Sequence, residues 1–130
     1  MSAGFQTVLR GGLDAPKLAR RVTAANEPAL PRSVRDDIAL LVTELVTNAV
    51  RHGGASDRSL QVGIRRHADR IRVEVVDPGT DFEPPATPSR GDASGGWGLF
   101  LVDRVAERWG VRRARAGTCV WFELPAGLTA

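Results

Sequence analysis

The sequence feature that most constrains the fold is a helical pattern of apolar residues within residues 36–53. These residues recur at spacings of three and four: Ile38, Leu41, Val42, Leu45, Ala49 and Val50. That period places them on one side of an α-helix, where they can be buried together. We therefore predict a core helix, with Asp36 and Asp37 near its N-terminal end and Gly53 and Gly54 closing it.

The same helix carries a second, polar stripe. Glu44 and Asn48 stand four residues apart, so they share one face, about 6 Å apart along the axis, with His52 a turn further on. Glutamate is common on solvated helices, so the stripe fits an ordinary surface. Asparagine is a poor mid-helix residue, because its side chain competes for backbone hydrogen bonds. The alternative is a ligand site, where Asn48 offers an oxygen to Mg²⁺ and Glu44 orients or deprotonates a nucleophile.

Length and composition limit the remaining choices. With 130 residues, the chain is large enough for a core but not for two domains, so we predict one domain over residues 1–130. The net charge of +3 comes almost wholly from arginines scattered among acids, which does not indicate a nucleic-acid surface. No apolar run could cross a bilayer, and the N-terminus lacks a signal peptide's pattern. A single cysteine, Cys119, excludes an internal disulfide, so we expect a cytoplasmic protein.

The rest of the chain alternates between strand and helix patterns. Alternating apolar residues predict strands at 5–10, 60–64, 71–77, 110–115 and 118–124. Helical spacing predicts two further helices, at 15–25 and 99–109, with Asp14 capping the first and Ser33 the central helix. Residues 80–94 show no periodicity, which favours a lid or binding loop. We predict a two-layer α+β sandwich, in which three helices cover one face of a mixed, mostly antiparallel sheet of about five strands.

Two short segments outside the central helix also contain residues suited to a ligand. Asp77 ends a predicted strand and is followed by Pro78 and Gly79; this is a common turn, although such a glycine also lets backbone approach a ligand. Gly96 and Gly98 precede the last predicted helix, where unpaired N–H groups can face an anion. A glycine cluster alone is more often a flexible entry to a helix.

Taken together, the three segments resemble the motifs of the GHKL ATPase superfamily, whose members share the Bergerat fold. Residues 44–53 resemble its N box, 77–79 its G1 box and 96–99 its G2 box, in the usual order. Three motifs in order are a far more specific signal than any one of them. The short length and residues 117–125 are most similar to the anti-sigma-factor serine kinases and to stand-alone actinobacterial ATP-binding proteins.

The resemblance implies a role for four residues of the N box and for the acid of the G1 box. Asn48 is similar to the residue that ligates Mg²⁺ on the ATP phosphates, and Glu44 is similar to the general base. Arg51 and His52 match positions near the phosphates. Asp77 matches the acid that accepts a hydrogen bond from the adenine amino group, a contact that selects adenine over guanine.

The other matched residues are expected to shape the same ATP site. Gly79 would let the end of the strand approach the base. Gly96 and Gly98 would let the lid and the helix entry wrap the phosphates, and Leu99 completes that motif. Thr118 matches a hydroxyl-bearing position under the nucleotide.

The resemblance therefore implies an ATP- and Mg²⁺-binding regulatory protein of the serine/threonine kinase type, which phosphorylates an anti-anti-sigma partner and also binds a sigma factor. It further suggests a homodimer through the N-terminal strand and helix, without direct contact to nucleic acid or membrane. Two alternatives stay open. Asp81 stands where the G1 box normally has a second glycine, which favours an ATP-binding regulatory module without phosphotransfer. The other alternative is a protein-interaction domain that binds no nucleotide.

Overall fold

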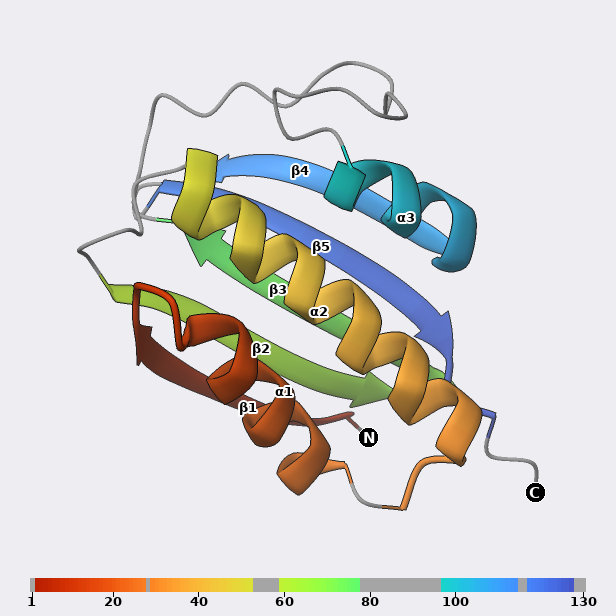
Figure 1. Ribbon diagram of the computed structural model, residues 1–130. Coiled ribbons are helices and arrows are strands. Elements are labelled where there is room, and N and C mark those ends of the chain that lie inside the picture. Colours follow the sequence, from red (N-terminus) through yellow and green to blue (C-terminus); the bar gives the residue numbers. More distant parts are fainter. Residues whose placement is uncertain (1, 28, 53–58, 78–96, 115–116, 128–130) are drawn as a thin grey trace.

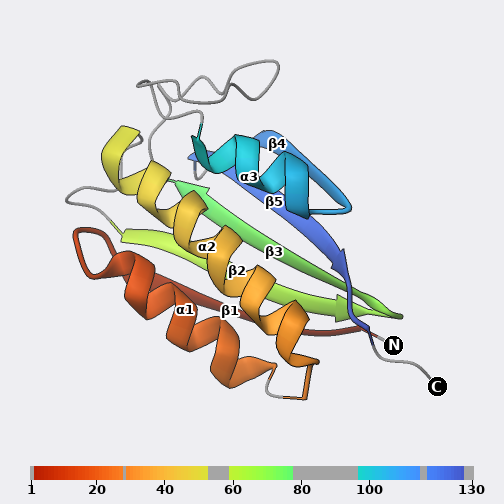
Figure 2. The ribbon, with the colours of Figure 1, turned by 45° about the vertical axis from the view of Figure 1, so that its right-hand side comes forward.

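The computed structural model of the chain describes residues 2–27, 29–52, 59–77, 97–114 and 117–127. The elements along the chain are β1 (Ser2–Arg10), α1 (Ala15–Asn26), α2 (Arg32–His52), β2 (Ser59–His67), β3 (Arg70–Asp77), α3 (Trp97–Val105), β4 (Arg108–Ala114) and β5 (Gly117–Pro125). The strands form one five-stranded sheet in the order β1-β2-β3-β5-β4 (Figure 1). All three helices lie on the same face of this sheet, as a second direction of view also shows (Figure 2). The predicted two-layer α+β sandwich is confirmed.

Every strand pairing among the described residues is antiparallel. The sheet is therefore not mixed, because β2–β3 and β4–β5 are hairpins and both β1 and β5 run opposite to the neighbours they join. The β2–β3 turn places Ala68 at a φ of 55°, the left-handed conformation that tight turns use. His67 is exposed and ends β2 just before this turn.

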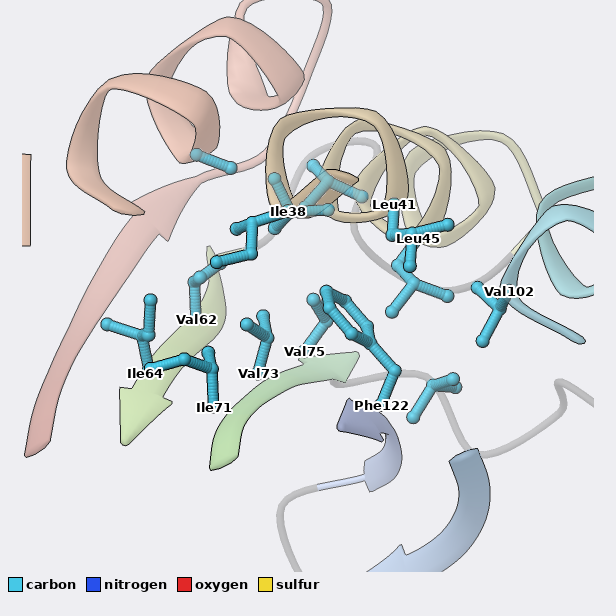
Figure 3. Close-up of a cluster of buried hydrophobic side chains, with 14 of the residues drawn as sticks. Ile38, Leu41, Leu45, Val62, Ile64, Ile71, Val73, Val75, Val102 and Phe122 are labelled. Carbon is cyan, nitrogen blue, oxygen red and sulfur yellow. The ribbon is translucent and has the colours of Figure 1, made fainter. Parts of the chain in front are cut away.

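The core fills the space between α2 and the sheet. Figure 3 shows Ile38 and Leu45 of α2 on one side of this space, with Val73 and Phe122 rising from the strands on the other. The predicted apolar stripe is confirmed, because five of its residues are buried: Ile38, Leu41, Val42, Leu45 and Ala49. Each Leu, Ile or Val buried in this way stabilises the fold by about 1.5–3 kcal/mol, which fixes α2 firmly across the sheet.

The N-terminal ends of two helices differ in detail from the prediction. Helix α2 begins at Arg32, so Ser33 lies inside the helix and is not its cap. The carbonyl of Pro31 accepts the first intrahelical hydrogen bond, from Arg35 N–H at 3.0 Å, and proline is tolerated there because its ring only restrains φ. Asp14 does occupy the N-cap position of α1, but its side chain makes no capping hydrogen bond.

Helix α3 is shorter than predicted. It ends at Val105, and the residues from Arg108 onward form β4, where Trp109 pairs with Phe122. The Trp109 indole N–H donates a hydrogen bond to Asp103 at 2.9 Å, so the ring folds back over the end of the helix. The helical spacing of Trp109 therefore reflects packing against α3 from a strand. Among the described residues, no helix combines the length and apolarity needed to cross a bilayer.

Candidate functional site

A small cavity lies where one end of α2 crosses the sheet. Its lining residues come from α2, β3, α3 and β5: Leu45, Asn48, Ala49, Val75, Asp77, Leu99, Thr118 and Val120. Four of the site residues predicted from sequence, Asn48, Asp77, Leu99 and Thr118, thus meet around one space. These four residues come from the three motifs and from the last strand, which are far apart along the chain.

Strand alternation explains why Asp77 and Thr118 face the helices. Asp77 follows Ile71, Val73 and Val75 at intervals of two on β3, so it points to the same buried side, and it is only 5% exposed. Thr118 is its direct partner on β5 and is 1% exposed. The two strands therefore place a carboxylate and a hydroxyl next to each other under α2.

Two polar atoms at this cavity have no hydrogen-bond partner among the described residues. They are Asn48 Nδ2 and Thr118 Oγ1, and both are buried. Leaving a buried donor or acceptor without a partner costs about 1–3 kcal/mol, and native proteins rarely accept that cost without a reason. A ligand with hydrogen-bonding groups would satisfy both atoms, which makes this cavity the candidate site.

The walls of the cavity are apolar. Val75 and Val120 form one side on adjacent strands, while Ala49 and Leu99 come from the helices. Apolar walls with a few converging polar groups are the usual composition of a small-molecule site. The described cavity measures about 20 Å³. That volume holds little more than one water molecule, so the described cavity is too small for a whole nucleotide.

Sequence reasoning missed these apolar walls. Val75 and Val120 were expected only as strand residues of the core. A usable signal exists, because each stands two residues from a polar site residue, Asp77 or Thr118, and so shares its face. Where a polar residue stands at the end of a strand, on its buried face, the apolar residue two positions away on that strand is therefore also expected to line the pocket.

The other residues predicted to lie near the phosphates are not among the described lining residues of this cavity. Glu44 is half-buried, one turn before Asn48 on α2, and the described residues give it no hydrogen bond or ion pair. Arg51 is exposed in the last turn of α2, and the side chain of His52 lies outside the described part. Gly98 lies in the first turn of α3.

Part of the predicted site falls on segments that the structure does not describe. Gly79, Gly96, Asp81 and the expected lid at 80–94 lie outside the described residues. The ligand roles assigned to individual residues from the resemblance therefore stay predictions.

Among the described residues, no group of three or more His, Cys, Asp or Glu side chains could hold a metal ion by itself. Asn48 nevertheless fits Mg²⁺ in another way. Mg²⁺ is commonly bound by one or two protein oxygens together with substrate phosphates and water. Because Nδ2 of Asn48 has no described partner, its carboxamide is free to turn its oxygen toward such a cation.

Comparison with known proteins identifies relatives along most of the chain. The family model described as histidine kinase-like ATPase domain matches residues 13–124. Serine-protein kinase RsbW of Bacillus subtilis is 33% identical over 85 residues, which cover 55% of this chain and 53% of that protein. Serine-protein kinase RsbW of Oceanobacillus iheyensis is 27% identical over 85 residues, covering 55% and 54%. The chain thus spans about half the length of these relatives.

Solved structures with the same fold come from a light-regulated kinase. The blue-light activated histidine kinase of Erythrobacter litoralis EL346 has a TM-score of 0.53 and 28% identity, over 75% of this chain and 32% of that one. The separately solved histidine kinase domain of that protein has a TM-score of 0.54 over 85% of this chain and 60% of its own. Its identity of 23% shows the fold alone. Because the family model spans nearly the whole described core, the chain belongs to the histidine kinase-like ATPase domain family, of the GHKL superfamily, whose members bind ATP.

Proposed function

We propose that this protein binds the adenine end of ATP in the cavity around Asp77 and transfers the γ-phosphoryl group to a serine or threonine of a protein partner. The observation that carries the proposal is the pair of buried atoms without described partners, Asn48 Nδ2 and Thr118 Oγ1, beside a buried carboxylate. The name serine-protein kinase of both bacterial relatives supports the choice of phosphoryl acceptor.

Adenine suits the described end of the cavity. A carboxylate can only accept hydrogen bonds, so Asp77 would accept one from the exocyclic amino group of adenine. Guanine has a carbonyl oxygen at the equivalent position, and the two oxygens would repel each other. The hydroxyl of Thr118 would donate to a ring nitrogen, and the apolar walls would cover the faces of the base.

The polar stripe of α2 would serve the phosphate end. Asn48 would hold Mg²⁺ through its carboxamide oxygen, and this ion neutralises phosphate charge when bound. Glu44, which has no described partner, would accept the proton of the acceptor hydroxyl. The hydroxyl oxygen then forms a bond to the γ-phosphorus while the bond to the β,γ-bridging oxygen breaks, so ADP leaves. Arg51 is exposed near the same end of α2 and would attract the phosphates.

The partner that we propose is an anti-anti-sigma protein, and a sigma factor would be a second partner. This part rests on the likeness of the chain to RsbW-type kinases, over about half the length of each. It does not rest on the cavity, which concerns only the nucleotide.

Phosphotransfer is tested by incubating the protein with γ-labelled ATP and a purified anti-anti-sigma protein. We expect label on a serine or threonine of that partner. Glu44→Gln should lower the transfer rate by about 10²–10⁴-fold, because a positioned general base contributes that much, while ATP affinity changes little. Asn48→Ala should weaken Mg-dependent ATP binding as well.

The phosphotransfer assay and a measurement of ATP binding together separate the competing functions. Tight ATP binding without transfer to any candidate acceptor would favour a regulatory module that senses ATP by occupancy, which the Asp81 substitution in the G1 box supports. Absence of binding to a fluorescent ATP analogue would leave only a nucleotide-free interaction domain. Equal transfer by Glu44→Gln and the parent would refute the role of Glu44.

A further inference from the structure

The face of the sheet opposite the helices carries a cluster of arginines that the nucleotide site does not use. We call it the open face and define it by five arginines: Arg65, Arg70, Arg72, Arg108 and Arg112. Alternation points them away from the core, because their strand neighbours Ile64, Ile71, Val73 and Val111 pack on the helix side. The described helices all lie on the other face of the sheet (Figure 1).

The register of the strands brings these residues into rows. Arg65 on β2 stands opposite Arg72 on β3, and Arg72 stands opposite Glu123 on β5. Glu123 in turn stands opposite Arg108 on β4. Opposite residues of antiparallel strands have Cβ atoms about 4.5–5.5 Å apart, so the charges form a continuous row across four strands.

Two glutamates hold three of the arginines in place. Glu123 contacts Arg108 at 2.6 Å and Arg72 at 3.3 Å, and Glu74 contacts Arg72 at 3.1 Å and Arg112 at 3.8 Å. Both acids are already engaged, while the side chains of Arg108 and Arg112 remain 59% and 62% exposed. The ion pairs therefore orient the guanidinium groups without covering them.

The remaining groups leave the open face with more positive than negative charge. Arg65 is exposed and has no hydrogen bond or ion pair among the described residues. Cys119, beside Arg112, is fully buried, and burial first, then the Glu74 carboxylate, raise the pKa of its thiol, so the thiol stays neutral. Arg70 forms an ion pair with Glu107. The arginines thus outnumber the acids, and the open face is net positive.

An aromatic ring lies in the middle of the arginines. The Arg72 guanidinium lies 4.1 Å from the centre of the Trp121 ring, a cation–π contact. Trp121 lies flat over β4 at Gly110, where an added Cβ would be 2.7 Å from ring atom Cζ2. The ring is half-buried, so part of its surface stays available. Tryptophan and arginine are among the residue types that contribute most binding energy at protein–protein interfaces, so this cluster is typical of such an interface.

The face is also concave. A hollow of about 530 Å³ is lined by the five arginines, His67 and the two glutamates. A second hollow of about 290 Å³ adjoins it and shares Arg65, Arg72 and Glu74. Gly4 and Gly63 lie in the floor of the second hollow, and their missing side chains leave that space open. The two hollows together form a trough across the sheet.

We infer that the open face docks an acidic segment of a protein partner, with carboxylates meeting the arginines and an apolar side chain on Trp121. Charge complementarity favours this occupant, since a second copy of the chain would bring the same excess of arginines against it. A nucleic-acid backbone is disfavoured, because Glu74 and Glu123 stand in the middle of the trough and would face phosphates.

The test uses a fluorescein-labelled peptide of alternating glutamate and leucine, titrated with the protein and followed by fluorescence anisotropy. We expect saturable binding that weakens as salt increases. Arg65→Glu and Arg112→Glu should each weaken it about tenfold, because reversing a charge at the contact loses an attraction and adds a repulsion. Arg21→Glu is the matched control, because Arg21 is exposed on α1, on the helix side of the sheet. This variant should bind the peptide as tightly as the parent protein.

Binding of a fluorescent ATP analogue to the same variants reports on the fold and should not change, because the nucleotide cavity faces the other side of the sheet. Unchanged peptide binding by both open-face variants would overturn the inference. A labelled single-stranded oligonucleotide that binds through the same arginines more tightly than the peptide would assign the face to nucleic acid. Dissociation of a parent dimer by Arg65→Glu, measured by sedimentation, would assign it to a second copy.

Discussion

At the scale of single residues, Asn48 Nδ2 and Thr118 Oγ1 stand out because the described protein leaves both without a partner. The buried hydroxyl of Thr23, in contrast, is satisfied. Thr23 is 2% exposed and donates to the backbone carbonyls of Ala19 at 2.9 Å and Arg20 at 3.1 Å. The contrast between these two buried threonines gives a direct way to separate a structural hydroxyl from a functional one.

Thr118→Val should stabilise the ligand-free protein by about 1 kcal/mol, because it removes a hydroxyl without a described partner while keeping the shape of the side chain. The same change should weaken ATP binding, since the ligand loses its hydrogen bond to that hydroxyl. The measurements are urea unfolding without ligand and titration with ATP. Thr23→Val is the control, and we expect it to lose about 0.5–1.5 kcal/mol of stability while binding ATP normally. Destabilisation by Thr118→Val with unchanged ATP affinity would contradict this role for the hydroxyl.

At the scale of elements, the sequence predicts the interior of each helix and strand better than its ends. The apolar stripe of α2 is visible in the sequence because burial repeats with the helical period. Its start at Arg32 is not, because Pro31, which has no side-chain acceptor, precedes the helix in place of the cap predicted at Ser33. Trp109 joins a strand although its spacing fits α3, since pairing with Phe122 outweighs the local pattern.

At the candidate site, too, some residues can be predicted from the sequence and others are harder to predict. Asn48 is predictable because a helix rarely carries asparagine in its middle without a reason, and Asp77 because an acid ends an apolar strand. The apolar walls are harder to predict, because a valine lining a pocket and a valine filling a core look alike, and only the spacing of two from Asp77 or Thr118 distinguishes them. Their placement depends on strand register, which brings Val75 opposite Val120.

The packing of Trp121 on β5 against Gly110 on β4 predicts how a substitution at Gly110 changes stability. Gly110→Ala should destabilise the protein by about 1–3 kcal/mol, because the new Cβ would lie 2.7 Å from the Trp121 ring and force it away from Arg72. Thermal or urea unfolding measures the loss. Gly63→Ala is the control, since its Cβ would meet its nearest atom, Phe5 O, at 3.6 Å, an ordinary contact. Equal stability of the two variants would show that the Trp121 ring does not depend on Gly110.

At the scale of the whole molecule, one sheet separates two surfaces with different chemistry. The helix side buries the core and ends in a cavity with Asn48, Asp77 and Thr118, while the open face presents arginines around Trp121. Because neighbouring residues of a strand point to opposite sides, Thr118 and Cys119 point to opposite sides of the sheet although they are adjacent in sequence. We therefore expect that mutations can disrupt the proposed nucleotide binding and the proposed docking of an acidic partner separately.

The central claim is that the cavity around Asp77 recognises adenine. Calorimetric titration of the parent and of Asp77→Asn with Mg-ATP and Mg-GTP tests it most directly, with circular dichroism checking that the variant is folded. We predict that the parent binds ATP at least about tenfold more tightly than GTP, and that Asp77→Asn loses most of this preference, because a carboxamide can also donate to the guanine carbonyl. Equal affinity of the parent for both nucleotides, or an unchanged preference in Asp77→Asn, would contradict the claim.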